Sequence, residues 1–352
     1  MILGLPGETN ESWIRGLCDL VDKGINNQIF VYHAEVYPNT ELNEKGYRKK
    51  HGIKSTKIQL NEIHSSPREQ TWLNEYQEIV TETSSMTKKD WQQRSIFSII
   101  LILFHSFKLG FYFLNYFINE LKIPSEDFLK AIFEKSNKKD TPFIYKNVIE
   151  EITGWTNKIL NGQGRGIYNP NYSDVYLDIE EIVFLKLSKN FTKFYSELDK
   201  IIKILLGEKR YIQKKEIIKD IKKYQLLRMP TINGENKMVE FNYNIAEYMF
   251  ACRSNEKVKL KKNKNVIKSI NCKNYGNDYH SFTKYKIIWA RNSDRIKNDI
   301  NYDNNKLEKI RNEEMRKNID LKNLKPQKSG LFEKLNKFEK YSSIDTKNNK
   351  SL

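Results

Sequence analysis

The residues best suited to chemistry lie in a short turn near the start of the chain, in the stretch ILGLPGETNES. Gly4 and Gly7 can adopt positive φ angles and let the backbone approach a ligand closely, and Pro6 stiffens the turn between them. The N–H groups at the start of the following helix attract anions such as a carboxylate. Two roles are open to Glu8, because its carboxylate can accept a hydrogen bond from a ribose hydroxyl or cap the helix. A tight strand-to-helix turn without a ligand is the alternative for the whole stretch.

The elements around this turn form a recognisable order. Residues 1–3 are apolar and predict the end of a strand, and Thr9 or Asn10 caps a helix that ends at Gly24. The stretch NQIFVYHAEVYP, residues 27–38, is rich in β-branched and aromatic residues and predicts a second strand. Strand, helix and strand in this order predict a βαβ unit, whose parallel strands need neighbours on both sides. The helix presents one apolar face with a 3.6-residue period, formed by Trp13, Leu17, Leu20 and Val21.

Helical patterns dominate from about residue 61 to 206. One helix is predicted to start at a capping pair formed by Thr87 and Asp90, and a second to have Ser125 as its cap, with acidic residues in its first turn. A third, long helix is predicted over 173–206, after the glycine-rich loop NGQGRGIYNPNYS.

The apolar run SIFSIILILFHSFKLGFYFLNYF, residues 95–117, is long enough to cross a bilayer. The polar residues His105, Lys108 and Asn115 interrupt this run, so we expect a buried helical hairpin bent near Gly110. A membrane-contacting surface is the alternative.

Positive charge is concentrated in the last part of the chain. The formal net charge is +17, of which residues 251–352 carry +14. A nucleic acid could bind a lysine cluster there while aromatic rings stack on its bases. Nucleic-acid binding is nevertheless not expected, because no helix-turn-helix, zinc or RNA-binding signature accompanies the cluster. The lysines are Lys257, Lys259, Lys261, Lys262 and Lys264, and the aromatic residues are Tyr275, Tyr279 and Trp289.

The three cysteines, Cys18, Cys252 and Cys272, match neither a disulfide framework nor a C-x-x-C metal site. Such cysteine usage suits a reducing compartment, so we expect a cytoplasmic protein, with membrane association as the alternative. No secretory signal or transit peptide is recognised in the first residues.

Several of these segments together resemble the cobalamin-dependent radical S-adenosylmethionine (SAM) enzymes. ILGLPGET and FVYHAEVYPNTEL look like late strands of the radical SAM barrel, and EYQEIVTETSSMTKKDWQQRSIFSIILILFHSFKLGFYFLNYF is similar to the helical region that follows it. SFTKYKIIWARNSD looks like the closing segment of that subgroup. The resemblance implies an α/β fold followed by a mainly α part, namely the C-terminal portion of a TIM-type (β/α) barrel plus a helical domain and a basic tail. It also implies that the adenosyl part of SAM is contacted by Gly4, Leu5, Pro6, Gly7, Glu8 and Tyr32.

The cofactor set that the resemblance implies is SAM, a 4Fe-4S cluster and cobalamin. A cluster of this kind needs three thiolates in C-x-x-x-C-x-x-C spacing, and that motif is absent from these 352 residues. We therefore expect a C-terminal fragment without catalytic residues or metal ligands, inactive alone, whose parent transfers methyl groups or performs related radical chemistry on a small or lipid-linked substrate. A non-catalytic basic helical protein that binds an anionic surface is the alternative. The expected regions are 1–60 (end of the barrel), 61–250 (helical domain), 251–298 (basic linker with the closing segment) and 299–352 (charged tail, disordered or frayed helix).

Two histidines have competing interpretations. His33, on the second strand, is expected to be half-buried and bonded to backbone, with a substrate-facing or cobalamin-facing position as the alternative. His105 is expected to be a core histidine with one hydrogen bond.

Overall fold

The computed structural model describes residues 1–302, except 68, 70–72, 255, 257 and 289–296. Its seven labelled strands are β1 Ile2–Leu3, β2 Tyr32–His33, β3 Lys54–Gln59, β4 Tyr76–Glu82, β5 Met238–Tyr243, β6 Lys262–Ile270 and β7 Asp299–Tyr302. The α-helices are α1 Asn10–Asp22, α2 Lys45–His51, α3 Lys88–Leu101, α4 Phe111–Tyr116, α5 Ser125–Lys135, α6 Pro142–Ile144, α7 Glu150–Leu160, α8 Ile179–Ser188, α9 Phe191–Leu206, α10 Glu208–Arg228, α11 Ile245–Arg253 and α12 Tyr279–Thr283. A 3₁₀-helix, η1 Glu41–Asn43, and four π-helices, η2 Ile102–Ser106, η3 Phe117–Leu121, η4 Tyr145–Ile149 and η5 Lys284–Ile288, complete the described elements.

The amino-terminal strands form the predicted parallel pair. β1 pairs with β2 in the register Ile2 with Tyr32 and Leu3 with His33, and α1 connects the two strands. The second strand is shorter than the predicted 27–38, because only two of its residues pair with β1. Beyond β2, Glu35 forms an antiparallel bridge with Ile79 of β4, and β4 in turn pairs with β3. Mixed α/β structure is therefore present, in small sheets.

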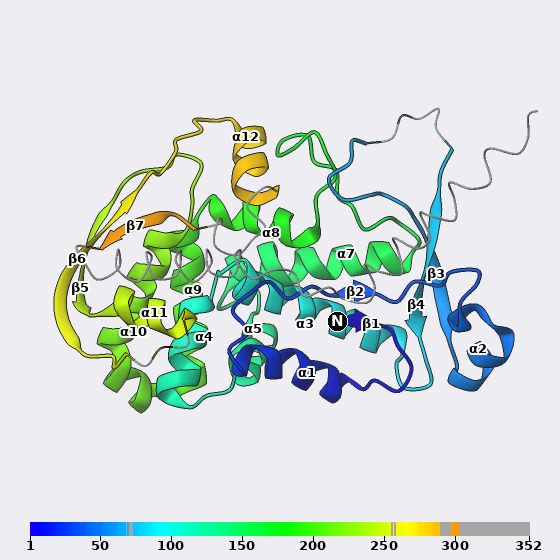
Figure 1. The fold of residues 1–352 in the computed structure, drawn as a ribbon, viewed down its shortest axis with the longest axis horizontal. Coiled ribbons are helices and arrows are strands. Elements are labelled where there is room, and N and C mark those ends of the chain that lie inside the picture. Colours follow the sequence, from blue (N-terminus) through cyan, green and yellow to red (C-terminus); the bar gives the residue numbers. More distant parts are fainter. Residues whose placement is uncertain (68, 70–72, 255, 257, 289–296, 303–352) are drawn as a thin grey trace, which may run out of the picture. The chain divides into compact units, whose positions relative to one another are not determined.

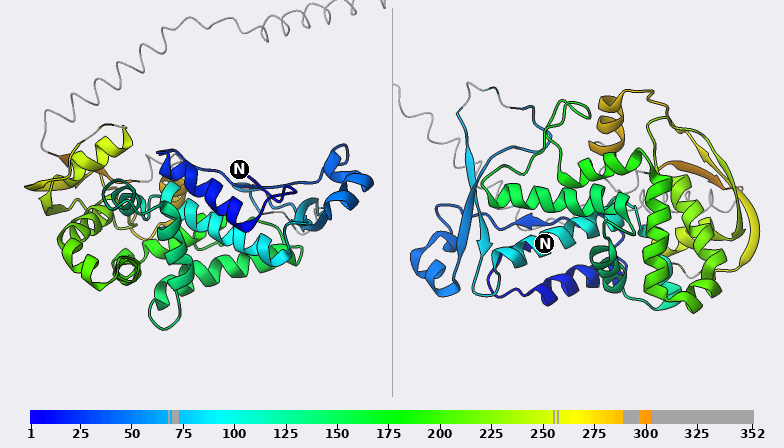
Figure 2. Two further views of the ribbon diagram at one scale, coloured as in Figure 1. Left: turned by 90° about the horizontal axis from the view of Figure 1, so that it is seen from below. Right: turned by 180° about the vertical axis from the view of Figure 1, so that it is seen from behind.

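The helices α1 and α3 lie next to these strands, and local capping signals start both of them. Thr87 caps α3 in a capping box with Asp90, as the sequence predicts, and Thr9, one of the two predicted candidates, caps α1 in a capping box with Ser12. The apolar side of α1 packs on α3, where the Trp13 indole N–H donates to Ser98 Oγ at 3.1 Å. α3 also contacts α5 and α7, which explains why its apolar residues are buried on all sides. Figure 2 (left) shows α3 lying between the amino-terminal elements and α7.

The apolar run bends where it was predicted to bend. The helices Lys88–Ser106 and Phe111–Leu121 meet at 85°, a corner rather than the expected hairpin. A Cβ atom at Gly110 would lie 2.4 Å from the Phe104 ring, so the corner requires a glycine. In the described part of the chain no single helix is long and apolar enough to cross a membrane, although this bent pair passes the same criteria together.

Two of the predicted helix boundaries are wrong. Ser125 is the first residue of α5 and Pro124 its N-cap, and the Ser125 hydroxyl donates instead to Cys18 O at 3.2 Å. The long helix predicted over 173–206 is two helices, α8 and α9, because the Asn190 side chain accepts a hydrogen bond from Lys193 N and starts a new helix.

Strands also occur where helix or linker was expected. β5 lies in the region predicted to be helical, and with β6 and β7 it forms a three-stranded sheet beside α10 and α11 (Figure 1). Hydrogen bonds between β3 and β4 cross the boundary predicted after residue 60. Residues Met1–Asn301 pack as one compact unit. Lys257, Trp289 and, after β7, the predicted charged tail lie outside the described residues.

Candidate functional site

Glycine is favoured at the two glycine positions of the predicted turn for different structural reasons. Gly4 has a φ of 112° and Gly7 a φ of 90°, both in the region that favours glycine. A Cβ atom at Gly4 would lie 3.1 Å from Val80 O of β4, whereas a Cβ atom at Gly7 would meet nothing within 4 Å. The neighbour that approaches Gly4 is thus another strand of the same protein. Gly7 N donates to Ser85 Oγ at 3.1 Å, which ties the turn to the loop before α3.

The start of α1 satisfies its own polar groups. Ser12 N donates to Thr9 Oγ1 at 3.2 Å, and Thr9 N donates to Ser12 Oγ at 2.9 Å. The Ser12 hydroxyl also donates to the Glu8 carboxylate. Glu8 directly precedes the N-cap Thr9, and its carboxylate accepts from a side-chain hydroxyl of the first turn.

Arg94 donates hydrogen bonds to the turn, a role that was not predicted from the sequence. Its side chain is 1% exposed; Nη2 donates to Glu8 O at 3.0 Å and to Ser85 O at 3.1 Å, while Nε donates to Asn10 Oδ1 at 2.7 Å. Burial lowers the pKa of the guanidinium, opposed by the nearby carboxylates. Nη1 is buried without a hydrogen-bond partner among the described residues. Arg94 directly precedes the apolar run of residues 95–117, a position that by itself predicts no such role.

The remaining residues of the predicted site lie at the surface of the sheet. Leu5 is exposed and Pro6 is partly buried, after the end of β1. The Tyr32 ring is 57% exposed and stacks on Phe30, with ring centroids 6.1 Å apart and planes 16° from parallel. Ile2, in register with Tyr32, is 49% exposed. Ile2, Phe30 and Tyr32 are called here the exposed face of the β1–β2 sheet.

His33 lies on the opposite face, against helices. Its ring centroid is 5.0 Å from that of Trp91 on α3 and 6.1 Å from that of Trp155 on α7. Burial, with a smaller contribution from the Arg165 charge, lowers the pKa of His33 to about 3, so the ring is neutral at physiological pH. In the described chain, His33 Nδ1 and Trp91 Nε1 are buried without hydrogen-bond partners. The backbone hydrogen bond expected for His33 is therefore not made by Nδ1.

The glycine-rich loop after α7 reaches the same side of the sheet. Arg165 Nη2 lies 3.4 Å from Glu35 Oε1, and the Trp155 indole N–H donates to Arg165 O at 2.9 Å. The Tyr37 hydroxyl donates to the Glu35 carboxylate, and this bond is the main reason that the pKa of Tyr37 is raised. Close packing fixes the loop, because a Cβ atom at Gly164 would lie 2.6 Å from Gln59 O.

His105 and the three cysteines are not part of the turn or of the exposed face of the β1–β2 sheet. His105 is buried and its Nε2 donates to Ile25 O at 2.8 Å, which confirms the expected core histidine with one hydrogen bond. All three cysteines are free thiols, and burial raises the pKa of Cys18 to about 12. Within the described residues, no group of three or more His, Cys, Asp or Glu side chains is arranged to hold a metal ion.

Comparison with protein-family models and with curated proteins finds no match to this sequence. The functional interpretation therefore depends on the residues and geometry given above.

Proposed function

We propose that this chain is the C-terminal part of a cobalamin-dependent radical SAM enzyme. In this proposal β1, α1 and β2 are the last strands and helix of a TIM-type (β/α) barrel, and the helices after β4 shape the substrate pocket. The thiolates of the cluster motif are absent from this sequence, so the residues present do not fit a 4Fe-4S cluster, and no radical step is assigned to them.

The observation that carries the proposal is the exposed face of the β1–β2 sheet. Parallel sheets are normally covered on both faces. Here α3 and α7 pack on the face of His33, while Ile2, Phe30 and Tyr32 remain exposed on the other. β1 pairs only with β2 among the described strands, so its other edge is open. Further barrel strands, supplied by polypeptide outside these residues, would pair with this edge and enclose the exposed face.

Of the residues expected at the adenosyl group, Tyr32 is the one proposed here, together with Phe30, which was not expected. The stacked, exposed rings of Phe30 and Tyr32 offer an aromatic surface for adenine, beside the first residues of β1. Glu8 is less suited to a ribose hydroxyl, since its carboxylate already accepts from Ser12. The proposed contact is therefore stacking on Tyr32.

The binding test uses S-adenosylhomocysteine as a stable probe, detected by saturation-transfer NMR on the purified chain. We expect transfer to the adenine protons, and a loss of it in Tyr32→Ala. Tyr168→Ala is the matched control, because Tyr168 is also exposed but lies in the loop before α8. The adenosyl contact is refuted if transfer is absent or is equal in Tyr32→Ala and the unchanged chain.

The activity test is reconstitution with iron and sulfide under anaerobic conditions, followed by an assay for SAM cleavage. We expect no cleavage by this chain alone, since the thiolate motif is not present in it. Cleavage of SAM would contradict the proposal that this chain is an inactive C-terminal part of a larger enzyme.

A second candidate function is supported by β6. Lys262, Lys264 and Lys268 are exposed on this strand, although Lys262 Nζ is paired with Glu216 at 2.8 Å. A non-catalytic chain could use these side chains to bind an anionic membrane surface. Sedimentation with phosphatidylserine vesicles tests this, and binding should weaken with salt and in Lys264→Gln/Lys268→Gln. Lys49→Gln/Lys50→Gln on α2 removes the same charge from another exposed site and should leave binding unchanged.

A further inference from the structure

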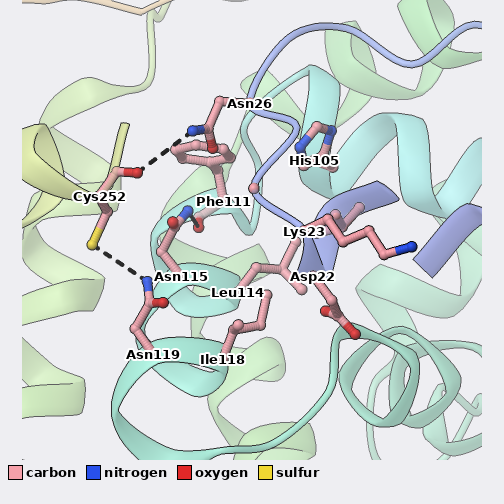
Figure 3. Close-up of a pocket in the computed structure, with 12 residues that line it drawn as sticks. Asp22, Lys23, Asn26, His105, Phe111, Leu114, Asn115, Ile118, Asn119 and Cys252 are labelled. Carbon is pink, nitrogen blue, oxygen red and sulfur yellow. Dashed lines mark hydrogen bonds between the residues drawn. The ribbon is translucent and has the colours of Figure 1, made fainter. Parts of the chain in front are cut away.

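Two features lie outside the site predicted from the sequence: a cavity beside His105 and the outer face of the β5–β6 sheet. The cavity, of about 190 Å³, is bounded by the end of α1, by α4 and by α11 (Figure 3). Its side-chain amides are bonded to the protein itself, because Asn26 Nδ2 donates to Arg253 O at 3.3 Å and Asn115 Nδ2 donates to Phe111 O at 2.8 Å. The cavity therefore selects no class of ligand, whereas the sheet face does.

The outer face of the β5–β6 sheet is defined by the strand register. Met238 of β5 pairs with Lys268 of β6, and Glu240 pairs with Val266, so these four side chains point to the same side of the sheet. All four are exposed, whereas Ile267, which lies between two of them, is buried on the opposite side. One face of the sheet is thus covered and the other is open.

Helix α10 covers the inner side of this sheet and one edge of it. The ring of Tyr224 on α10 meets the buried ring of Phe241 on β5, with centroids 6.2 Å apart. Asp220 Oδ2 accepts from two backbone N–H groups of β5, and Lys223 Nζ donates to a backbone carbonyl of the same strand at 2.8 Å. Because α10 already bonds to these edge groups, an additional strand is not the partner that they would take.

Two apolar side chains stand on the outer face. Met238 is 70% exposed and Val266 is 44% exposed. They belong to neighbouring cross-strand pairs and are therefore diagonal neighbours on adjacent strands. Lys264 and Lys268 lie two residues before and after Val266 along β6, so cations border the apolar pair.

Positive charge surrounds this apolar pair. Five exposed lysines lie within residues 259–268, and no acidic residue occurs within 258–270. Glu216, which pairs with one of these lysines at 2.8 Å, and Glu240 oppose them, so the surface keeps a net positive charge. Clusters of about four to eight cationic side chains are typical of surfaces that bind anionic lipid headgroups. The five are Lys259, Lys261, Lys262, Lys264 and Lys268.

The apolar side chains decide between anionic partners. A nucleic acid would stack its bases on aromatic rings placed among the cations. The exposed apolar side chains among these cations are those of Met238 and Val266, which offer no ring for stacking. Side chains of this kind insert instead at the boundary between lipid headgroups and acyl chains. An anionic lipid surface therefore fits this face better than a nucleic acid does.

We propose that the outer face of the β5–β6 sheet lies on an anionic membrane, with Met238 and Val266 inserted below the headgroups and the lysines of β6 among them. This inference rests on the second candidate function given above, and adds to it an apolar contact and an orientation of the sheet. Binding through charge alone is lost at high salt, whereas an inserted apolar pair leaves a part of the binding that salt does not remove.

The first experiment measures sedimentation of the full chain with vesicles of phosphatidylserine and phosphatidylcholine. Met238→Ser should weaken binding about fivefold and Val266→Ser about threefold, because each removes exposed apolar area from the contact. Ile25→Ser is the matched control and should leave binding unchanged, since Ile25 is also 44% exposed but lies in the loop after α1. Equal binding by the three variants and the unchanged chain overturns the insertion.

The second experiment locates the contact by paramagnetic broadening. The chain carries ¹³C-methyl methionine and is added to bicelles that contain phosphatidylserine and a doxyl-labelled lipid. The Met238 methyl resonance, assigned by its loss in Met238→Ser, should broaden. The resonances of Met1, which is 38% exposed on another part of the surface, and of the buried Met86 should stay sharp. A sharp Met238 resonance in the bound chain contradicts the proposed orientation.

Failure of this inference and failure of the second candidate function give different results. No sedimentation of the unchanged chain with phosphatidylserine vesicles refutes that function and the inference with it. Sedimentation that salt abolishes entirely and that Met238→Ser leaves unchanged refutes the insertion alone. Tighter binding to a single-stranded RNA than to the vesicles, with no effect of Met238→Ser, overturns the choice of lipid over nucleic acid.

Discussion

Because β4 approaches the amino-terminal turn closely at Gly4, replacing Gly4 by alanine should destabilise the protein more than replacing Gly7 by alanine. Gly4→Ala places a side chain at a φ of 112°, which costs about 1–2 kcal/mol, and brings a Cβ atom to 3.1 Å from Val80 O and 3.3 Å from Ala34 Cβ. Relief of that crowding adds about 1–2 kcal/mol. Gly7→Ala meets no atom within 4 Å and costs only the backbone strain, about 1 kcal/mol. The expected difference between the two variants is about 2 kcal/mol.

Urea unfolding followed by tryptophan fluorescence measures this difference. With a slope of about 3 kcal/mol per molar urea, Gly4→Ala should lower the midpoint by about 1 M and Gly7→Ala by about 0.3 M. Trp91 and Trp13 are buried close to the turn, so their emission reports its unfolding. Equal midpoints for both variants would refute the reasoning, because crowding by β4 would then not explain why glycine occupies position 4.

Three further substitutions test single interactions. Glu197→Gln weakens the charge-assisted acceptor that holds the N–H groups at the start of α6, and should lower the free energy of unfolding by about 2 kcal/mol in a thermal melt. Thr87→Ala removes the N-cap of α3 and should cost about 1 kcal/mol in the same assay, and no change would show that the cap is dispensable. The pKa of His33 is lowered from 6.5 to about 3 in the folded state, so the folded protein binds fewer protons and its stability falls as the pH drops from about 6.5 towards 3. His33→Gln should flatten this fall in urea midpoints measured between pH 7 and 4, and an unchanged slope would contradict the buried neutral ring.

Elements with a local signal could be predicted from the sequence. Thr87 was recognisable as a helix cap because its capping partner Asp90 lies three residues away, and Thr9 was one of two candidates for the cap of α1. The bend at Gly110 followed from a glycine within an apolar run. The break at Asn190 was also local, but the apolar period continues through it and concealed the cap.

The candidate site was predictable only in part, because its geometry depends on contacts between distant segments. The positive φ angles of Gly4 and Gly7 were expected, but Arg94 meets Glu8 across 86 positions, a pairing that residue spacing does not encode. In the same way, His105 was expected in the core, but the cavity beside it combines three separate stretches of the chain.

The buried guanidinium of Arg94 has a consequence for how the protein opens. It bonds to the turn before α1, to Asn10 in that helix and to the loop before α3, so these segments cannot separate without exposing it. Such bonds join segments distant in sequence into one cooperative unit of local unfolding. In native-state hydrogen exchange, the amides of the first turn of α1 should therefore exchange with the same opening free energy as those of α3, rather than fray as a chain terminus does.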